Sequence, residues 1–177
     1  VCGQRITDFH PQKLERSGVF YLGNAPAFMD CMDLAENFFL MRRSSHNKLL
    51  LNNRAVHLRT AQVLQDFAMP YDVTSPTSGL DHLDRLLLSI VRAVDQGARL
   101  IVLDDMTKGL NVPQIHRLLA LLGLVKERGV ALLIADNWSN WFEPLSDCIL
   151  LYQDGRIERK IYDQTSPRSR ALLQKWT

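Results

Sequence analysis

The sequence has 177 residues, of which 46% are hydrophobic, so it is long enough to form one compact domain with a buried core. Its 21 Lys and Arg residues nearly balance its 19 Asp and Glu residues, and the signs are mixed along the chain, which argues against a nucleic-acid partner. No apolar run approaches the roughly 18 residues that a membrane-spanning helix needs, so we expect no span. Three widely separated cysteines are typical of reduced thiols in a cytoplasmic protein.

The first half of the chain is predicted to be mainly helical. An apolar run at residues 19–22 has the β-branched and aromatic composition of a buried strand. Helices are expected at residues 10–16, 34–41, 53–67 and 81–96. Asp33 is expected to cap the second of these helices, because its side chain can accept from the free N–H groups of the first turn. The polar segment 43–53 is expected to be a surface connection.

The second half alternates between strands and helices. Strands are expected at residues 100–103, 130–135, 148–152 and 156–162, and helices at 111–128, 139–145 and 166–176. The first two strands are predicted to be buried, the strand at 100–103 on both faces, because four consecutive aliphatic residues are typical of a parallel sheet covered by helices. This alternation predicts an α/β fold with a largely parallel sheet.

The most informative stretch is the segment 80–111, which reads LDHLDRLLLSIVRAVDQGARLIVLDDMTKGLN. It resembles the segment of ABC ATPases that runs from the signature motif, through a helix, to the Walker B strand and the D-loop. The signature would lie at 80–84, Walker B at 103–105 and the D-loop at 108–111, and this spacing needs no gap. Residues 21–24 resemble the Q-loop strand, and residues 33–40 are similar to the segment that follows it in sugar-importer ATPases.

The resemblance covers nearly the whole chain and implies a P-loop NTPase-like fold of the ABC type. It implies a single, partial domain over residues 1–177, with a helical subdomain at about 26–92, RecA-like core elements at about 97–162 and a C-terminal helix at about 166–176. The family's Gly-rich Walker A loop would precede Val1, and no Gly-x-x-x-x-Gly-Lys-Ser/Thr motif occurs in the sequence. Because the sequence also starts without methionine, we expect that an upstream part is missing.

The resemblance assigns four candidate residues near the phosphates of ATP. Asp104 would hold Mg²⁺ through water, and Asp105 stands where the family has its catalytic glutamate, one methylene longer. Asn24 takes the place of the Q-loop glutamine, and its amide oxygen could accept from magnesium-bound water. Asn137 takes the place of the switch histidine, although an amide cannot handle protons as an imidazole does.

The signature positions carry unusual residues for this family. Asp81, His82 and Leu83 stand where working members have a serine and two glycines at a helix N-terminus, and Asp84 follows them. In those members the serine and glycines donate hydrogen bonds to the γ-phosphate of ATP bound by the partner subunit. A carboxylate at this place would repel the phosphate by about 1 to 4 kcal/mol for each close charge pair.

Each assignment has a simpler structural alternative. Asp104 and Asp105 could merely end a strand, and Asp81 could be the N-cap of a helix with Asp84 in its first turn. Plain loop polarity is an equal alternative for Asn24 and Asn137. An aromatic group, Trp138, Trp141 and Phe142, could either form a partner-docking patch or pack a short helix onto the body.

The sequence therefore predicts the ATP-binding domain of a sugar-type ABC importer whose site residues are eroded. Its cofactors would be ATP and Mg²⁺. Its partners would be a second ABC ATPase domain, arranged head to tail, and a membrane permease at the cytoplasmic face of the plasma membrane. The alternative is a non-catalytic scaffold with the same fold, which pairs with an active ATPase or permease without productive ATP binding. The activity of the family is ATP hydrolysis coupled to transport, but because four site positions are altered we expect little or no turnover by this chain on its own.

Overall fold

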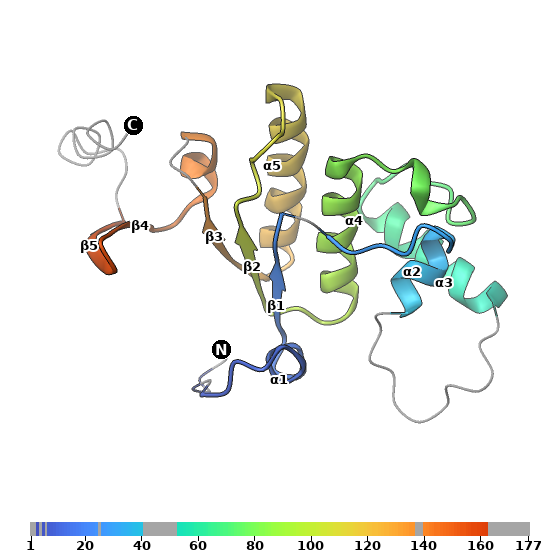
Figure 1. Ribbon diagram of the computed structural model, residues 1–177, viewed down its shortest axis with the longest axis horizontal. Coiled ribbons are helices and arrows are strands. Elements are labelled where there is room, and N and C mark those ends of the chain that lie inside the picture. Colours follow the sequence, from blue (N-terminus) through green and yellow to red (C-terminus); the bar gives the residue numbers. More distant parts are fainter. Residues whose placement is uncertain are drawn as a thin grey trace.

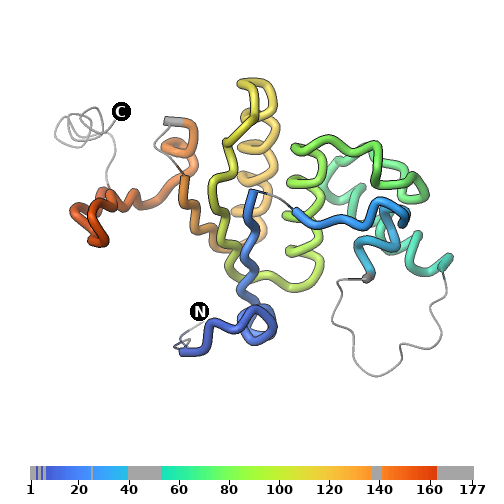
Figure 2. The backbone as a smooth tube through the Cα atoms, viewed as in Figure 1, coloured from blue at the N-terminus to red at the C-terminus, as the bar shows by residue number. Residues whose placement is uncertain are grey.

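The computed structural model describes residues 3, 5, 7–24, 26–40, 53–136 and 140–162 (Figures 1 and 2). The α-helices are α1 (Pro11–Arg16), α2 (Leu34–Leu40), α3 (Asn53–Asp66), α4 (His82–Asp95) and α5 (Val112–Glu127). The 3₁₀ helices are η1 (Thr77–Gly79) and η2 (Asn140–Leu145), and the strands are β1 (Val19–Leu22), β2 (Leu100–Asp104), β3 (Ala131–Ala135), β4 (Ile149–Gln153) and β5 (Arg156–Ile161). These elements confirm the predicted helices and strands within the described residues. The expected helix at 166–176, and the connection at 43–52, lie outside them.

The central sheet contains three parallel strands in the order β1-β2-β3. Strands β4 and β5 form a separate antiparallel hairpin. Its two-residue turn, Asp154 and Gly155, has φ angles of 49° and 80°, and positive φ at both central positions matches the right-handed twist of the flanking strands. The predicted parallel sheet with a terminal hairpin is confirmed.

The hydrophobic core lies between the sheet and the helices α4 and α5, which stand beside β1 and β2 in Figure 1. Ile101 and Leu103 of β2 are fully buried in this core. The alternate residues face the other way: Val102 is only partly buried, and Leu133 of β3 is 48% exposed. The prediction that β2 is buried on both faces was therefore wrong, and β3 is less buried than predicted, because among the described elements helices cover only one face of the sheet.

Helices α2 and α5 begin with side-chain caps, and the predicted cap at Asp33 is confirmed. Asp33 accepts from the backbone N–H of Glu36 at 2.7 Å, while the Glu36 carboxylate accepts from the N–H of Asp33 at 3.0 Å. Asn111 and Gln114 form the same reciprocal pair at the start of α5, at 3.0 Å in both directions. Each pair satisfies two N–H groups that would otherwise lack partners, which defines where the helix starts. None of the described helices is long and apolar enough to cross a membrane.

Candidate nucleotide site at the carboxyl edge of the sheet

Asp104 ends β2 and lies at the carboxyl edge of the parallel sheet, where α/β proteins usually bind their ligands. Its Oδ2 accepts a hydrogen bond of 2.7 Å from the hydroxyl of Tyr21. Tyr21 is paired with Val102, two residues before Asp104 and on the same face of the sheet, so its ring reaches along the sheet to the carboxylate. This hydrogen bond to Asp104 raises the pKa of Tyr21, because a neighbouring carboxylate favours the neutral phenol.

Asp105 follows in a left-handed backbone conformation, with a φ of 56°. Such a conformation costs a residue with a side chain about 1–2 kcal/mol. Its N–H donates to the carbonyl of Ala135 at 2.8 Å, which extends the β2–β3 pairing by one bond. Its carboxylate lies 3.7 Å from the ammonium of Lys108, and both groups are exposed. Asp105, at the position of the catalytic glutamate, therefore lies in a turn, and its carboxylate faces Lys108.

Asn24 and His82 contact each other across 58 residues of sequence. Nε2 of His82 lies 2.7 Å from Oδ1 of Asn24, and since the amide oxygen only accepts, the imidazole nitrogen must donate. The contact connects the loop after β1 with the first residue of α4. The oxygen of Asn24 that could have accepted from magnesium-bound water is therefore already bonded to a residue of the signature segment.

The remaining signature residues also have partners within the chain. Asp81 is the N-cap of α4, and its Oδ1 accepts from the N–H of Asp84 at 2.7 Å. Asp81 thus has the N-cap role that was given as the alternative to a role at the phosphate. Leu83 is fully buried in the core, so its side chain does not reach a ligand.

The Asp84 carboxylate is held between the helical part of the chain and α5. Its Oδ1 accepts from the Tyr71 hydroxyl at 2.5 Å and lies 3.4 Å from Nη2 of Arg117. Burial, and then the hydrogen bond to Asp84, raise the pKa of Tyr71 well above its usual range. This cluster joins the signature segment to α5.

Asp136 is a residue of this edge that the sequence reasoning missed. It directly follows β3, as Asp105 follows β2, and its two carboxylate oxygens accept from the N–H and the hydroxyl of Thr107 at 2.9 and 2.8 Å. It therefore fixes the turn that leads into the predicted D-loop. A polar residue directly after a predicted buried strand was the available signal. Asn137, the next residue, lies outside the described residues.

Two residues of the aromatic group, Trp141 and Phe142, pack against the rest of the chain. Phe142 is buried in the core, and Trp141 packs edge-on against His116 of α5, with 5.5 Å between the ring centroids. These contacts favour packing over partner docking for both residues. Trp138 lies outside the described residues.

Two of the candidate side chains at this edge are already hydrogen-bonded within the chain. One oxygen of Asp104 is taken by Tyr21, and the oxygen of Asn24 is taken by His82. The sequence contains no Gly-rich phosphate loop that would add backbone N–H donors.

No family model matches the chain, but curated proteins do. It is 27% identical over 149 residues to Ribose import ATP-binding protein RbsA 2 of Mesorhizobium japonicum, which covers 83% of this chain and 29% of that protein. It is 22% identical over 153 residues to the Galactofuranose transporter ATP-binding protein YtfR of Escherichia coli, covering 86% and 30%. The chain thus spans about 30% of the length of the curated relatives it matches.

Solved structures share the fold. A nucleotide-free ATP-binding cassette from an ABC transporter matches with a TM-score of 0.76 and 16% identity, over 96% of this chain and 70% of that one. The cbiO1 protein of Clostridium perfringens matches with a TM-score of 0.72 and 15% identity, over 95% and 67%. The fold is therefore that of an ABC ATP-binding cassette.

Within that class, the curated relatives are ATP-binding proteins of sugar importers. The predicted resemblance to a sugar-importer ABC ATP-binding domain, and the predicted P-loop NTPase-like fold, are confirmed.

Proposed function

We propose that the chain is part of the ATP-binding domain of a sugar-type ABC importer, and that its own nucleotide site is weakened. One observation supports the proposal that the nucleotide site is weakened. Three of the polar side chains that the resemblance assigns to the nucleotide, Asn24, Asp84 and Asp104, are each hydrogen-bonded to another side chain of the same chain. A nucleotide would have to replace these bonds. Only the bond to Asp84 is part-buried, and leaving a buried donor or acceptor unpaired costs about 1–3 kcal/mol, whereas water can satisfy the two exposed pairs.

The charges at the signature segment act in the same direction. Asp81 and Asp84 place two carboxylates at the start of α4, where a working cassette presents donors to a γ-phosphate. The carboxylate of Asp105 is shorter than that of glutamate, and a shift of the reacting groups by about 1 Å can reduce a rate about a hundredfold. We therefore expect little or no ATP turnover by this chain on its own.

In the proposed importer the chain pairs head to tail with a second ABC ATPase domain. The helical part, residues 26–92, meets a membrane permease, so the complex lies at the cytoplasmic face of the plasma membrane. Asp104 remains the residue that would hold Mg²⁺ through water, and Asp81, His82, Leu83 and Asp84 the segment that would face the partner's ATP. The names of the relatives, a ribose import ATP-binding protein and a galactofuranose transporter ATP-binding protein, support this kind of assembly.

The alternative function is a scaffold that pairs with an active ATPase or permease without binding ATP productively. The hydrogen bonds that Tyr21 makes to Asp104 and His82 to Asn24 favour it. Both functions use the same surface for pairing. They differ in whether ATP drives the association.

The test is sedimentation of this chain mixed with a curated relative, the ribose import ATP-binding protein. Association that requires MgATP supports the importer domain, and equal association without nucleotide supports the scaffold. No association under either condition would contradict both.

Calorimetric titration of MgATP into the chain alone measures its own site, and we expect no saturable binding up to millimolar nucleotide. Magnesium-dependent binding that is lost in Asp104→Asn would contradict the weakened site. Asp154→Asn is the matched control, because it removes the same charge in the exposed hairpin turn, where asparagine tolerates the positive φ.

A further inference from the structure

Asp81 carries a carboxylate whose charge no neighbouring side chain balances. Its Oδ1 accepts from the N–H of Asp84 at 2.7 Å, and its carbonyl accepts from the N–H of Arg85 at 3.1 Å, so both contacts are to the backbone of α4. Asp81 is exposed, and no ion pair between described residues includes it. The carboxylate therefore meets solvent at the N-terminus of α4, where the helix dipole offsets only part of its charge.

The two basic residues that follow Asp81 in α4, His82 and Arg85, are bonded to other groups. The His82 ring donates to the amide oxygen of Asn24 at 2.7 Å. Arg85 donates to the carboxylate of Asp30 at 2.6 Å and to two backbone carbonyls at 3.0 and 3.2 Å. Neither side chain can turn toward Asp81 without losing these bonds. The uncompensated charge is therefore a consequence of how the loop after β1 is attached to α4.

Asp84, the second carboxylate of the signature segment, is placed differently. Its side chain is only 21% exposed, accepts from the Tyr71 hydroxyl and lies 3.4 Å from the guanidinium of Arg117, which balances its charge. Of the two carboxylates, Asp81 alone presents an unbalanced negative charge to a group that approaches the start of α4.

We propose that Asp81 sets the nucleotide selectivity with which this chain pairs with a second ATPase domain, disfavouring a partner site that holds ATP relative to one that holds ADP. The inference rests on the proposed function, in which the signature segment faces the nucleotide of the partner. The γ-phosphate is the group that this segment would meet, and ADP lacks it. One pair of like charges at about 4 Å weakens association about fivefold even in a watery interface, and more in a drier one.

The probe is the ribose import ATP-binding protein, loaded with Mg²⁺ and either ADP or a non-hydrolysable ATP analogue. Sedimentation gives the Kd of its association with the 177-residue chain, and the selectivity is the ratio of the Kd with ADP to the Kd with the analogue. Asp81→Asn removes the charge and keeps an oxygen that can cap α4, because asparagine and aspartate are equally good N-caps. Asp81→Ser also caps and should reproduce its result.

We expect Asp81→Asn to raise this selectivity about fivefold or more at low salt. The increase should shrink at about 1 M salt, where the Debye length falls to about 3 Å. A change in helix capping alone would not depend on which nucleotide the partner holds, nor on salt in this way.

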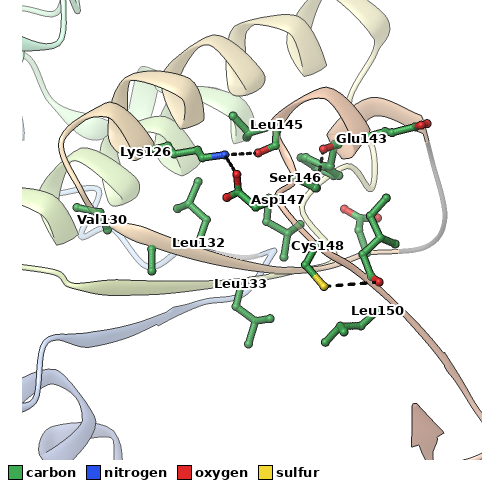
Figure 3. A pocket seen from close by; sticks show the side chains of 15 residues that line it. Lys126, Val130, Leu132, Leu133, Glu143, Leu145, Ser146, Asp147, Cys148 and Leu150 are labelled. Atoms are coloured by element: carbon green, nitrogen blue, oxygen red, sulfur yellow. Dashed lines mark hydrogen bonds and ion pairs between the residues drawn. The ribbon is translucent and has the colours of Figure 1, made fainter. Parts of the chain in front are cut away.

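Two matched variants test whether the position of the carboxylate decides the effect. Asp84→Asn removes a charge that Arg117 already balances and should change the selectivity less than about twofold. Asp147→Asn removes a carboxylate that accepts from Lys126 at 2.7 Å beside a cavity of about 470 Å³ between β3 and β4 (Figure 3). Because β3 lies at the end of the sheet farther from α4 (Figure 1), this variant should leave the selectivity unchanged.

Equal selectivity in Asp81→Asn and the parent chain, an equal increase in Asp147→Asn, or an increase that salt does not reduce would each overturn the inference and leave the pairing itself intact. Absence of association in every nucleotide state, for the parent chain and both Asp81 variants, would contradict the proposed function and the inference with it.

Discussion

Replacing Asp84 with alanine tests whether the signature segment is tied to α5 as the structure shows. Asp84 lies in the first turn of α4, where its carboxylate accepts from the Tyr71 hydroxyl and faces Arg117. If these contacts persist in solution, Asp84 is committed to the fold and is unavailable to a nucleotide. The loss of stability in this variant therefore indicates whether Asp84 is available to a ligand at the candidate site.

The expected loss is the sum of three effects. A hydrogen bond to a charged group contributes about 1.5–3 kcal/mol, and half-burial of Tyr71 places this bond toward the lower value. The negative charge at the start of α4 contributes about 0.5 kcal/mol through the helix dipole. Arg117 adds less than about 1 kcal/mol, because its side chain is 55% exposed and solvent screens the pair. We expect Asp84→Ala to lower the free energy of unfolding by about 2–3 kcal/mol.

The measurement is urea unfolding at neutral pH, in a double-mutant cycle with Tyr71→Phe. The coupling energy between the two positions should be about 1–2 kcal/mol, because each single change removes the same hydrogen bond. Asp84→Asn is the control, since it keeps an acceptor oxygen and removes the charge. A loss below about 0.5 kcal/mol for Asp84→Ala, or a coupling energy near zero, would refute the tie and leave Asp84 free to meet a ligand.

Three further predictions follow from described contacts. Asn111→Ala removes the cap of α5 and should lower the free energy of unfolding by about 1 kcal/mol, measured by urea unfolding; an unchanged midpoint would contradict the capping box. Leu88→Ala, at a fully buried position, should cost about 2–5 kcal/mol and lower the Tm, whereas Leu133→Ala on the exposed face should cost much less; similar losses would contradict the one-sided core. Tyr71 should ionise above the usual phenol pKa of about 10, because burial, and then Asp84, raise its pKa, so the stability that this phenol contributes is present below about pH 10 and is lost as the pH rises toward the raised pKa. Ultraviolet titration of tyrosinate should show this late ionisation in the parent chain and an earlier one in Asp84→Asn; identical curves would contradict it.

Local sequence patterns determined where the elements begin and what they are. Asp33 and Asn111 cap the helices they precede, because a short side chain that accepts from the first-turn N–H groups works without the rest of the fold. The aliphatic run before Asp104 forms a strand that ends at this carboxylate. The βα alternation was sufficient to predict the parallel sheet, since parallel strands need helical crossovers. The spacing of motifs from Leu80 to Asn111 was sufficient to predict the ABC class.

Only the tertiary structure decided what the candidate site residues contact. The pairs Tyr21–Asp104, Asn24–His82 and Tyr71–Asp84 join residues separated by 83, 58 and 13 positions, and no local periodicity encodes such partners. The burial of β2 and β3 was overestimated for a related reason. A run of aliphatic residues shows that a strand can be covered on both faces, but whether a second layer lies against it depends on which other segments pack there. Strand identity is therefore a local property of this sequence, whereas the exposed face of β3 and the hydrogen bond that occupies Asp104 depend on contacts between distant parts of the chain.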